Sequence, residues 1–152
     1  MNELTEQLHL NVQLDDSISL DKFINCDSTK DFLNILNNTT EDNSISNFYF
    51  IWGDEGRGKS YVMQGLHRKH IEDAKQTFCF SFKDKKVTSP EILMNLDSLE
   101  ALFIEDLESM EISEDWERAM FNLINGCYVS GTKIYLSSNI VPKDLPIRLK
   151  DL

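Results

Sequence analysis

Short apolar runs alternate with helical patterns through the central and carboxyl-terminal parts of the chain. The apolar runs cover residues 48–52, 77–82, 99–105 and 133–138. Apolar residues recur at helical spacing over residues 59–73 and 114–129. Strands that alternate with helices predict an α/β fold with a parallel sheet, in which functional groups gather at the carboxyl ends of the strands.

Both long helices have a clear predicted core-facing side. For residues 59–73, the inward positions are Val62, Met63, Leu66 and Ile71, whereas His67 and His70 are interpreted as surface residues. Ser113 is the predicted N-cap of the helix over 114–129 and Gly131 its C-terminal cap. Its inward residues are Trp116, Met120, Leu123, Ile124 and Cys127.

Two further helices are predicted from their start signals. Ser28 is a plausible N-cap for a helix whose apolar face is Phe32, Leu33, Ile35 and Leu36, followed by a polar loop over residues 37–47. Ser89 and Pro90 open a short helix that reaches about Leu96. The segment 147–152 has the composition to begin another helix.

Leu8, Leu10, Val12 and Leu14 alternate with polar residues, which is the period of an extended strand. From this pattern alone, the segment is either an edge strand or terminal tail that packs on the domain, or a short linear motif. Such a motif docks into the apolar groove of a partner through backbone hydrogen bonds and alternate side chains.

The strand over 48–52 runs directly into a G-x-x-x-x-G-K-S sequence, which a predicted helix follows. This is the phosphate-binding loop in its required context, where backbone N–H groups and the helix N-terminus face the phosphates. Lys59 would reach the β- and γ-phosphates, and the Ser60 hydroxyl would ligate Mg²⁺. The predicted nucleotide-binding residues are Gly53, Asp54, Glu55, Gly56, Arg57, Gly58, Lys59, Ser60 and Tyr61.

Polar residues end the last two strands of the predicted core. Glu105 and Asp106 end an apolar strand, and a nucleotide triphosphatase needs acids there to hold Mg²⁺ and to activate water. We therefore predict Ser60 and Glu105 as magnesium ligands and Asp106 as a catalytic residue. Asn139 ends the strand over 133–138, where it would contact the γ-phosphate or position water, although a lone Asn there also suits a turn.

Composition narrows the class of protein. The 152 residues carry a net charge of −11, which argues against a free-standing nucleic-acid binder. Three widely spaced cysteines, Cys26, Cys79 and Cys127, have no metal-site spacing and indicate reduced, buried thiols in a cytoplasmic protein. The sequence has no membrane-spanning apolar run and no signal-peptide pattern at its N-terminus.

With these motifs in order, the chain resembles AAA+ ATPases related to the replication initiator DnaA, and most of all the Hda family of regulatory inactivators of DnaA. The N-terminal residues match the family's QL-x-L-x-L clamp-binding motif as Gln7-Leu8-His9-Leu10-Asn11-Val12. Residues 116–125, WERAMFNLIN, are similar to the family's W-E-x-A-x-F-x-L-x-N helix. The resemblance covers nearly the whole chain.

The resemblance implies partners and a regulatory role. Gln7, Leu8, Leu10 and Val12 would dock on the β sliding clamp, so that residues 1–16 form an extended tail and residues 17–152 a partial AAA+ domain. Members of the family bind ADP or ATP with Mg²⁺ and promote hydrolysis of DnaA-bound ATP, contacting DNA only indirectly.

The sequence departs from the family pattern in two ways. Glu105 stands where the family has Asp, which puts magnesium handling in question. Residue 152 comes before the position of the family's arginine finger, its fifth strand and its helical lid, so we expect little or no ATP turnover. In the AAA+ strand order 5-1-4-3-2, the strand over 48–52 then becomes an edge, and we expect self-association or residues 6–14 to cover it.

Two alternatives to an Hda-like regulator stay open. One is a truncated ATPase module of a DnaA-type initiator or helicase loader, which needs no clamp motif. The other is a pure interaction module with a vestigial nucleotide pocket, which would bind neither ADP nor ATP.

Overall fold

The computed structural model describes residues 27–39 and 46–146, with side-chain positions from residue 33 onward. The helices are α1 (Asp27–Thr39), α2 (Lys59–Glu72) and α3 (Glu114–Ser130). The strands are β1 (Phe48–Trp52), β2 (Thr77–Ser81), β3 (Ala101–Glu105) and β4 (Lys133–Ser138). Single 3₁₀ turns occur at η2 (Pro90–Leu93), η3 (Leu96–Ser98), η4 (Leu107–Ser109) and η5 (Pro142–Asp144).

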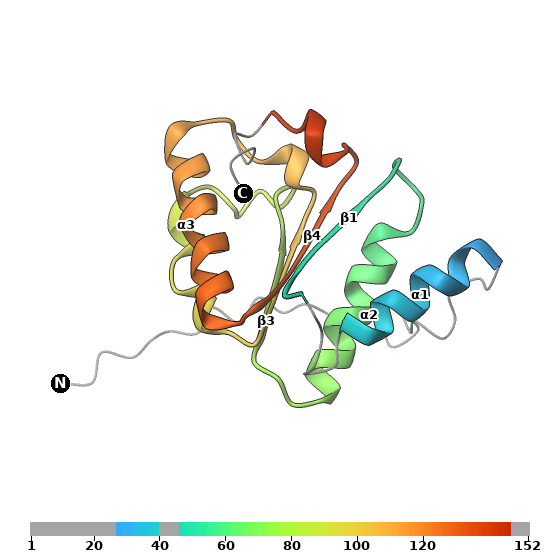
Figure 1. Cartoon of the computed structure of the whole chain (residues 1–152). Helices are drawn as coiled ribbons and strands as arrows, with labels where there is room; N and C mark the ends of the chain where they lie inside the picture. Colours follow the sequence, from blue (N-terminus) through green and yellow to red (C-terminus); the bar gives the residue numbers. More distant parts are fainter. Residues whose placement is uncertain (1–26, 40–45, 147–152) are drawn as a thin grey trace.

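The strands form one parallel sheet in the order β1-β4-β3-β2. Helix α3 covers one face, and α2 with α1 lies on the other (Figure 1). Every residue of β3 and of β4 is buried, as expected for central strands that are covered on both faces. The predicted α/β parallel sheet is therefore confirmed.

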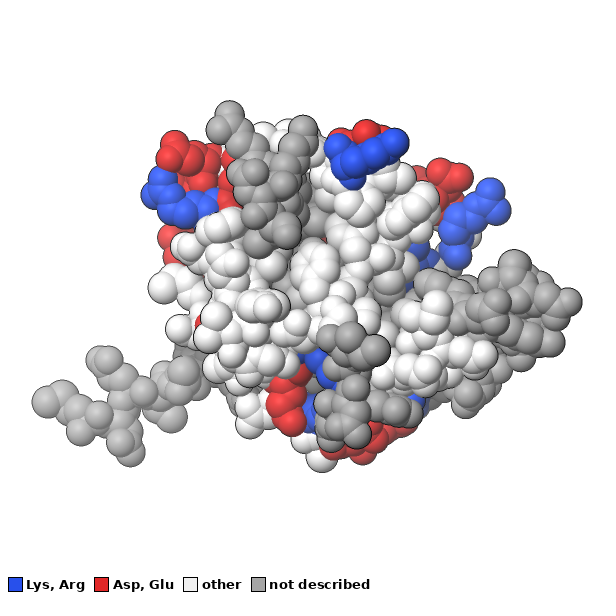
Figure 2. Space-filling model, viewed as in Figure 1, with Lys and Arg blue, Asp and Glu red and all other residues white. Residues whose placement is uncertain are grey.

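Strand β1 lies at an edge of the sheet, as the AAA+ strand order predicted. Two of its aromatic side chains remain accessible, since Phe48 is 39% and Trp52 57% exposed. In the same view as Figure 1, the middle of the surface carries few charged side chains, and most of those visible lie towards its rim (Figure 2). Residues 6–14, expected to cover this edge, lie outside the described part of the chain.

Side chains alternate between the two faces of β3. This alternation divides the core into two layers and sets the side of the sheet on which Glu105 lies. Leu102 and Ile104 pack on the α3 side, whereas Phe103 packs on the α2 side. The predicted inward residues of α3 are all buried, and Ser113 and Gly131 cap this helix as expected. Because Glu105 follows the period of Phe103, its side chain belongs to the side on which α2 begins.

Both histidines of α2 are buried, so their prediction as surface residues was wrong. His67 is 4% and His70 0% exposed, whereas Ile71, predicted inward, is 42% exposed. Val62, Met63 and Leu66 define the inward face, and the 100° helical step brings positions 67 and 70, rather than 71, onto it. The position of a residue along the helical period, rather than its polarity, therefore decides which side chains of α2 are buried.

The histidines pack against an aromatic stack that crosses three strands. Tyr135 of β4 stacks on Phe103 of β3, with centroids 4.7 Å apart, and on Tyr49 of β1 at 5.0 Å. His67 lies 5.0 Å from the ring of Phe103, and His70 lies 5.5 Å from the same ring. We call His67, His70, Phe103 and Tyr135 the histidine core.

Burial keeps the histidine core neutral. Desolvation, with a smaller effect of His70, lowers the pKa of His67 to about 4. Desolvation also lowers the pKa of His70, although its hydrogen bond to the Leu66 carbonyl opposes that shift. His67 keeps one hydrogen bond, between Nε2 and Thr77 Oγ1 at 2.9 Å.

Helix α1 differs from its prediction at both ends and on one face. It begins at Asp27, so Ser28 is not its N-cap, and it continues to Thr39, three residues into the predicted loop. Leu36 is buried as predicted, but Ile35 is 62% exposed. Lys133 Nζ donates to the Thr39 carbonyl at 2.7 Å, and the Tyr135 hydroxyl lies 2.9 Å from Thr39 Oγ1. The carboxyl end of α1 is thus fixed to the start of β4, with a cation where the helix dipole favours one.

Other expectations hold with small changes. Ser89 caps η2 through the Glu91 N–H, but this short helix is 3₁₀ and ends at Leu93. Cys127 is buried and Cys79 half-buried, and both are free thiols. None of the helices in the described part of the chain has the length and apolar character that crossing a membrane requires.

Candidate nucleotide-binding site

The predicted phosphate loop connects β1 to α2 at the carboxyl edge of the sheet. Gly56 and Gly58 have φ angles of 76° and 86°, a left-handed conformation that favours glycine over residues with a Cβ. Gly58 is the cap residue of α2, and its carbonyl accepts the first helical hydrogen bond, from Val62 N at 3.0 Å. The glycine spacing of the motif therefore matches the backbone that it forms.

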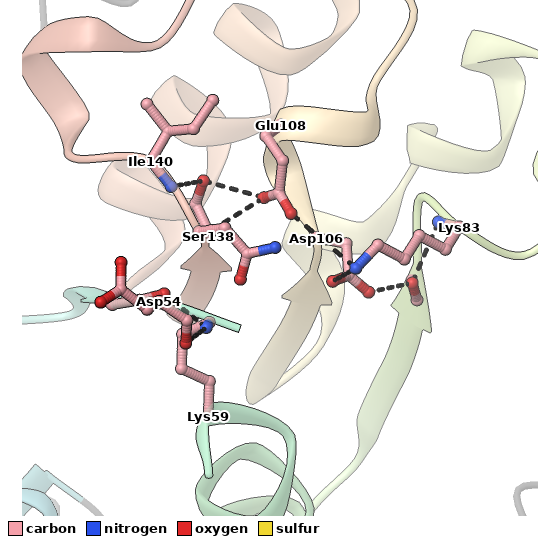
Figure 3. A network of polar contacts seen from close by, with 10 residues as sticks. Asp54, Lys59, Lys83, Asp106, Glu108, Ser138 and Ile140 are labelled. Atoms are coloured by element: carbon pink, nitrogen blue, oxygen red, sulfur yellow. Dashed lines mark hydrogen bonds and ion pairs between the residues drawn. The ribbon is translucent and has the colours of Figure 1, made fainter. Parts of the chain in front are cut away.

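Lys59 is folded over the loop that precedes it. Its Nζ donates to the carbonyl oxygens of Gly53 at 2.5 Å and Asp54 at 2.8 Å. Figure 3 shows this side chain rising from the start of α2 towards the loop. Asp54, Glu55, Gly56 and Arg57 are exposed, and Tyr61 is half-buried in the first turn of α2. The ammonium group therefore lies within the loop, where an anion would meet it.

The structure brings Ser60 and Glu105 together, as predicted for the two magnesium ligands. Glu105 is 8% exposed, and the Ser60 hydroxyl donates a hydrogen bond to its carboxylate. Burial raises the pKa of Glu105, and nearby Asp106 adds to that shift, while the Ser60 hydrogen bond and Lys83 oppose it. The extra methylene of Glu, compared with Asp, thus still allows direct contact with Ser60.

These two oxygen-bearing groups fit the way in which proteins hold Mg²⁺. This ion keeps several waters and takes one or two protein oxygens together with substrate phosphates. Within residues 27–39 and 46–146, no three His, Cys, Asp or Glu side chains form a metal cluster of their own. Mg²⁺ bound here would have Ser60 and Glu105 as its protein ligands.

Asp106 is turned towards the end of β2. Its backbone has φ 56° and ψ 48°, a left-handed conformation that Asp adopts more readily than most residues with a Cβ. Its Oδ2 accepts a hydrogen bond from Ser81 Oγ at 2.5 Å, and its Oδ1 lies 2.8 Å from Lys83 Nζ. Both carboxylate oxygens of the predicted catalytic acid are therefore bound by side chains of the protein.

Glu108 connects the ends of β3 and β4. Its Oε2 accepts hydrogen bonds from Ser138 Oγ at 2.9 Å and from the backbone N–H of Asn139 at 3.1 Å. Lys83 Nζ lies 3.9 Å from its other oxygen, Oε1 (Figure 3). We call the set Ser81, Lys83, Asp106, Glu108 and Ser138 the strand-end network.

Of the strand-end network, the sequence predicted Asp106 as a site residue but not Lys83 or Glu108. Lys83 belongs to a run of charges, Lys83-Asp84-Lys85-Lys86, that is typical of a solvated turn, and Glu108 follows Asp106 by two positions in a 3₁₀ turn. One signal was available for Glu108, since an acid so close to Glu105 and Asp106 must stay near the same sheet edge. Asn139 lies beside this network, as its place after β4 predicted.

The fold is that of an AAA+ P-loop nucleotide triphosphatase: a parallel sheet with helices on both faces and the phosphate loop between its first strand and the helix that follows. No protein-family model matches the chain.

Comparison with known proteins places the fold among replication initiators and helicase loaders. An AMPPCP-bound DnaA from Aquifex aeolicus is 21% identical, with a TM-score of 0.78 over 91% of this chain and 47% of that one. The DnaC helicase loader is 14% identical, with a TM-score of 0.64 over 88% of this chain and 83% of that one. An uncharacterised protein from Haemophilus influenzae is 27% identical over 98% of this chain, which spans 64% of that relative's length.

Proposed function

We propose that this chain binds an adenine nucleotide with Mg²⁺ at the phosphate loop. The observation that carries the proposal is the loop itself, with left-handed glycines, Lys59 at its centre and Ser60 hydrogen-bonded to Glu105. The similar fold of AMPPCP-bound DnaA supports the choice of an adenine nucleotide.

Binding follows from the groups in place. Backbone N–H groups of the loop and the N-terminus of α2 offer donors and positive potential to the phosphates. Lys59 exchanges two carbonyl acceptors, Gly53 and Asp54, for phosphate oxygens, which carry more charge. Ser60 and Glu105 would hold Mg²⁺, which neutralises phosphate charge when bound.

The geometry supports binding over rapid turnover. Asp106, the proposed water-activating acid, has one lone pair of each oxygen engaged by Ser81 or Lys83, and these contacts hold its side chain towards the end of β2. Asn139 is the proposed group for the γ-phosphate or the attacking water. We therefore propose a site in which the bound nucleotide acts mainly as a conformational ligand.

Isothermal titration calorimetry with Mg-ADP and Mg-ATP tests the nucleotide site. We expect Lys59→Ala to weaken binding by at least about tenfold, or 1.4 kcal/mol, because a charged hydrogen bond to phosphate is lost. Lys85→Ala, at an exposed lysine in the turn after β2, serves as the matched control and should bind as the native chain does. No heat of binding from the native chain, or equal affinities of the native and Lys59→Ala chains, would contradict the proposal.

The biological role that we propose is Hda-like: docking on the β sliding clamp and promoting hydrolysis of DnaA-bound ATP. The Gln7-Leu8-His9-Leu10 motif supports this role from the sequence, and it lies outside the described residues. A clamp pull-down tests it by comparing the native chain with Gln7→Ala/Leu8→Ala. His9→Ala, at a variable position of the motif, is the control. Equal retention of all three chains would remove the support for clamp docking.

The second candidate is the ATPase module of a DnaA-type initiator or helicase loader. The structural likeness to DnaA and DnaC supports it as well as it supports the first candidate. Steady-state hydrolysis separates the two, since turnover at the rates of ordinary ATPases, abolished by Lys59→Ala, would favour the module over the regulator.

A further inference from the structure

We infer that Glu108 is a positioning residue for the nucleotide site, which holds Asn139 in place and so supports the contact to the γ-phosphate that ADP lacks. This inference rests on the proposed function, because it concerns discrimination by a site that must first bind nucleotide. It adds to that function the residue that aligns the end of β4 with the phosphate loop.

The first observation is that one carboxylate oxygen fixes two consecutive residues. Oε2 of Glu108 accepts from the hydroxyl of Ser138 at 2.9 Å and from the backbone N–H of Asn139 at 3.1 Å. The Ser138 hydroxyl in turn accepts from Ile140 N at 3.0 Å. The turn that leaves β4 is therefore organised around Glu108, and Asn139 has its backbone set by a charge-assisted bond.

The second observation is that the same turn is connected to the phosphate loop. The carbonyl of Ser138 accepts a hydrogen bond from Gly53 N, the first residue of the loop motif, at 3.3 Å. Trp52 and Ser138 are also in register across β1 and β4. A displacement of the end of β4 must therefore shift either Asn139 relative to the loop or the loop itself.

The third observation is that Glu108 lies at a largely enclosed position. Its side chain is 12% exposed, and its Oε1 has no hydrogen-bond partner within the described residues. The nearest cation is Lys83 Nζ, 3.9 Å from Oε1, which also binds Asp106 at 2.8 Å. An enclosed carboxylate with one unsatisfied oxygen is costly for stability alone, which indicates a role in the site.

Because Asn139 is the group proposed for the γ-phosphate, losing its alignment should affect ATP more than ADP. We expect Glu108→Leu to lower ATP affinity about tenfold and ADP affinity less than about threefold. Glu108→Gln retains an oxygen that can accept both hydrogen bonds, and should keep the native ratio of ATP to ADP affinity within about threefold. Glu111→Gln removes an exposed acid three residues away and is the control.

A double-mutant cycle tests whether Glu108 acts through Asn139. In an Asn139→Ala background, we expect Glu108→Leu to cause no further fall in the ratio of ATP to ADP affinity. A purely structural role would lower the melting temperature and weaken both nucleotides alike, so thermal unfolding is measured on every variant.

The inference is overturned if Glu108→Leu keeps the native ATP-to-ADP ratio, if Glu108→Gln loses as much as Glu108→Leu, or if the two changes are additive in the cycle. A native chain that binds neither nucleotide would contradict the proposed function instead. If Glu108→Leu does not fold, amide hydrogen exchange of the native chain decides. Protection of the Asn139 N–H supports the inference, and exchange at the rate of an open loop overturns it.

Discussion

Two polar regions of the described molecule, the strand-end network and the histidine core, treat charge in opposite ways. In the strand-end network, Lys83 lies 2.8 Å from Asp106 and is itself about half exposed, so its charge has both a partner and water. In the histidine core, His67 and His70 lie among aromatic rings, and burial lowers the pKa of both. Charged side chains hold the strand-end network together, whereas the histidine core is most stable when its imidazoles are uncharged.

The difference between the two regions follows from where each lies in the sheet. At the carboxyl ends of the strands, Lys83 keeps about half of its side chain in solvent, so its ion pairs are partly screened. The middle of β3 and β4 is covered by α2, where an unpaired charge would be costly. The predictions below test this contrast, from the largest expected effect to the smallest.

Removing the central ring of the histidine core should have the largest effect. Phe103 is fully buried and contacts His67, His70 and Tyr135. Phe103→Ala should lower the free energy of unfolding by about 3–5 kcal/mol, measured by urea denaturation. Phe121→Ala, at a ring of α3 that is 41% exposed, is the matched control and should cost far less. Similar losses of unfolding free energy for Phe103→Ala and Phe121→Ala would mean that the histidine core stabilises the fold no more than an exposed ring does.

Acid should weaken the histidine core. The folded-state pKa of His67 is about 4, below its ordinary value of 6.5, so the unfolded chain binds the proton first. The stabilisation is fully present above pH 6.5 and is lost as the pH falls from 6.5 to 4, by roughly 3 kcal/mol for His67. Denaturation at a series of pH values measures this loss.

The groups around the pair define the expected titration. His67 faces His70, while His70 also feels Lys75 and Lys133, which lower its pKa further, and Asp73, which opposes them. NMR titration of the two imidazoles is the direct check. A His67 that titrates near pH 6.5 in the folded chain would show that the core accepts charge.

Tyr135→Phe should have an intermediate effect, because it removes one hydroxyl and keeps the ring stack. The Tyr135 hydroxyl contacts the side chain of Thr39 at 2.9 Å. We expect a loss of about 0.5–1.5 kcal/mol, with faster proteolysis within α1, which this contact joins to the sheet. Cleavage rates equal to those of the native chain would mean that Lys133 fixes α1 without Tyr135.

Lys83→Met should have the smallest effect on stability. Lys83 is half-exposed, so its pairs with Asp106 and Glu108 should contribute about 1 kcal/mol or less and weaken further in high salt. Urea denaturation at low and high salt measures this, with Lys85→Met as the control. A loss as large as that of Phe103→Ala would show that the network, rather than the histidine core, holds the sheet together.

The sequence predicted the elements that have strong local signals. The strand before Gly53, the loop up to Ser60 and the caps Ser113 and Gly131 lie where their residue types placed them. The pairing of Ser60 with Glu105 was also predictable, since parallel strands bring their carboxyl ends to one edge.

The sequence could not predict features that depend on tertiary packing. The helical period already turns His67 and His70 towards the core, but the stack of Phe103 and Tyr135 that receives them is formed only in the folded chain. The roles of Lys83 and Glu108 depend on the distance between three strand ends, which no spacing along the chain encodes.

The exposed edge of the sheet offers a natural optical reporter. The chain contains two tryptophans, of which Trp116 is 4% exposed against Phe82, while Trp52 is 57% exposed and immediately precedes Gly53. Intrinsic fluorescence should therefore divide into a shielded component at shorter wavelength and a component at longer wavelength that iodide quenches. The quenchable component comes from the strand that leads into the phosphate loop, so ligand-induced changes there can be followed without any attached dye.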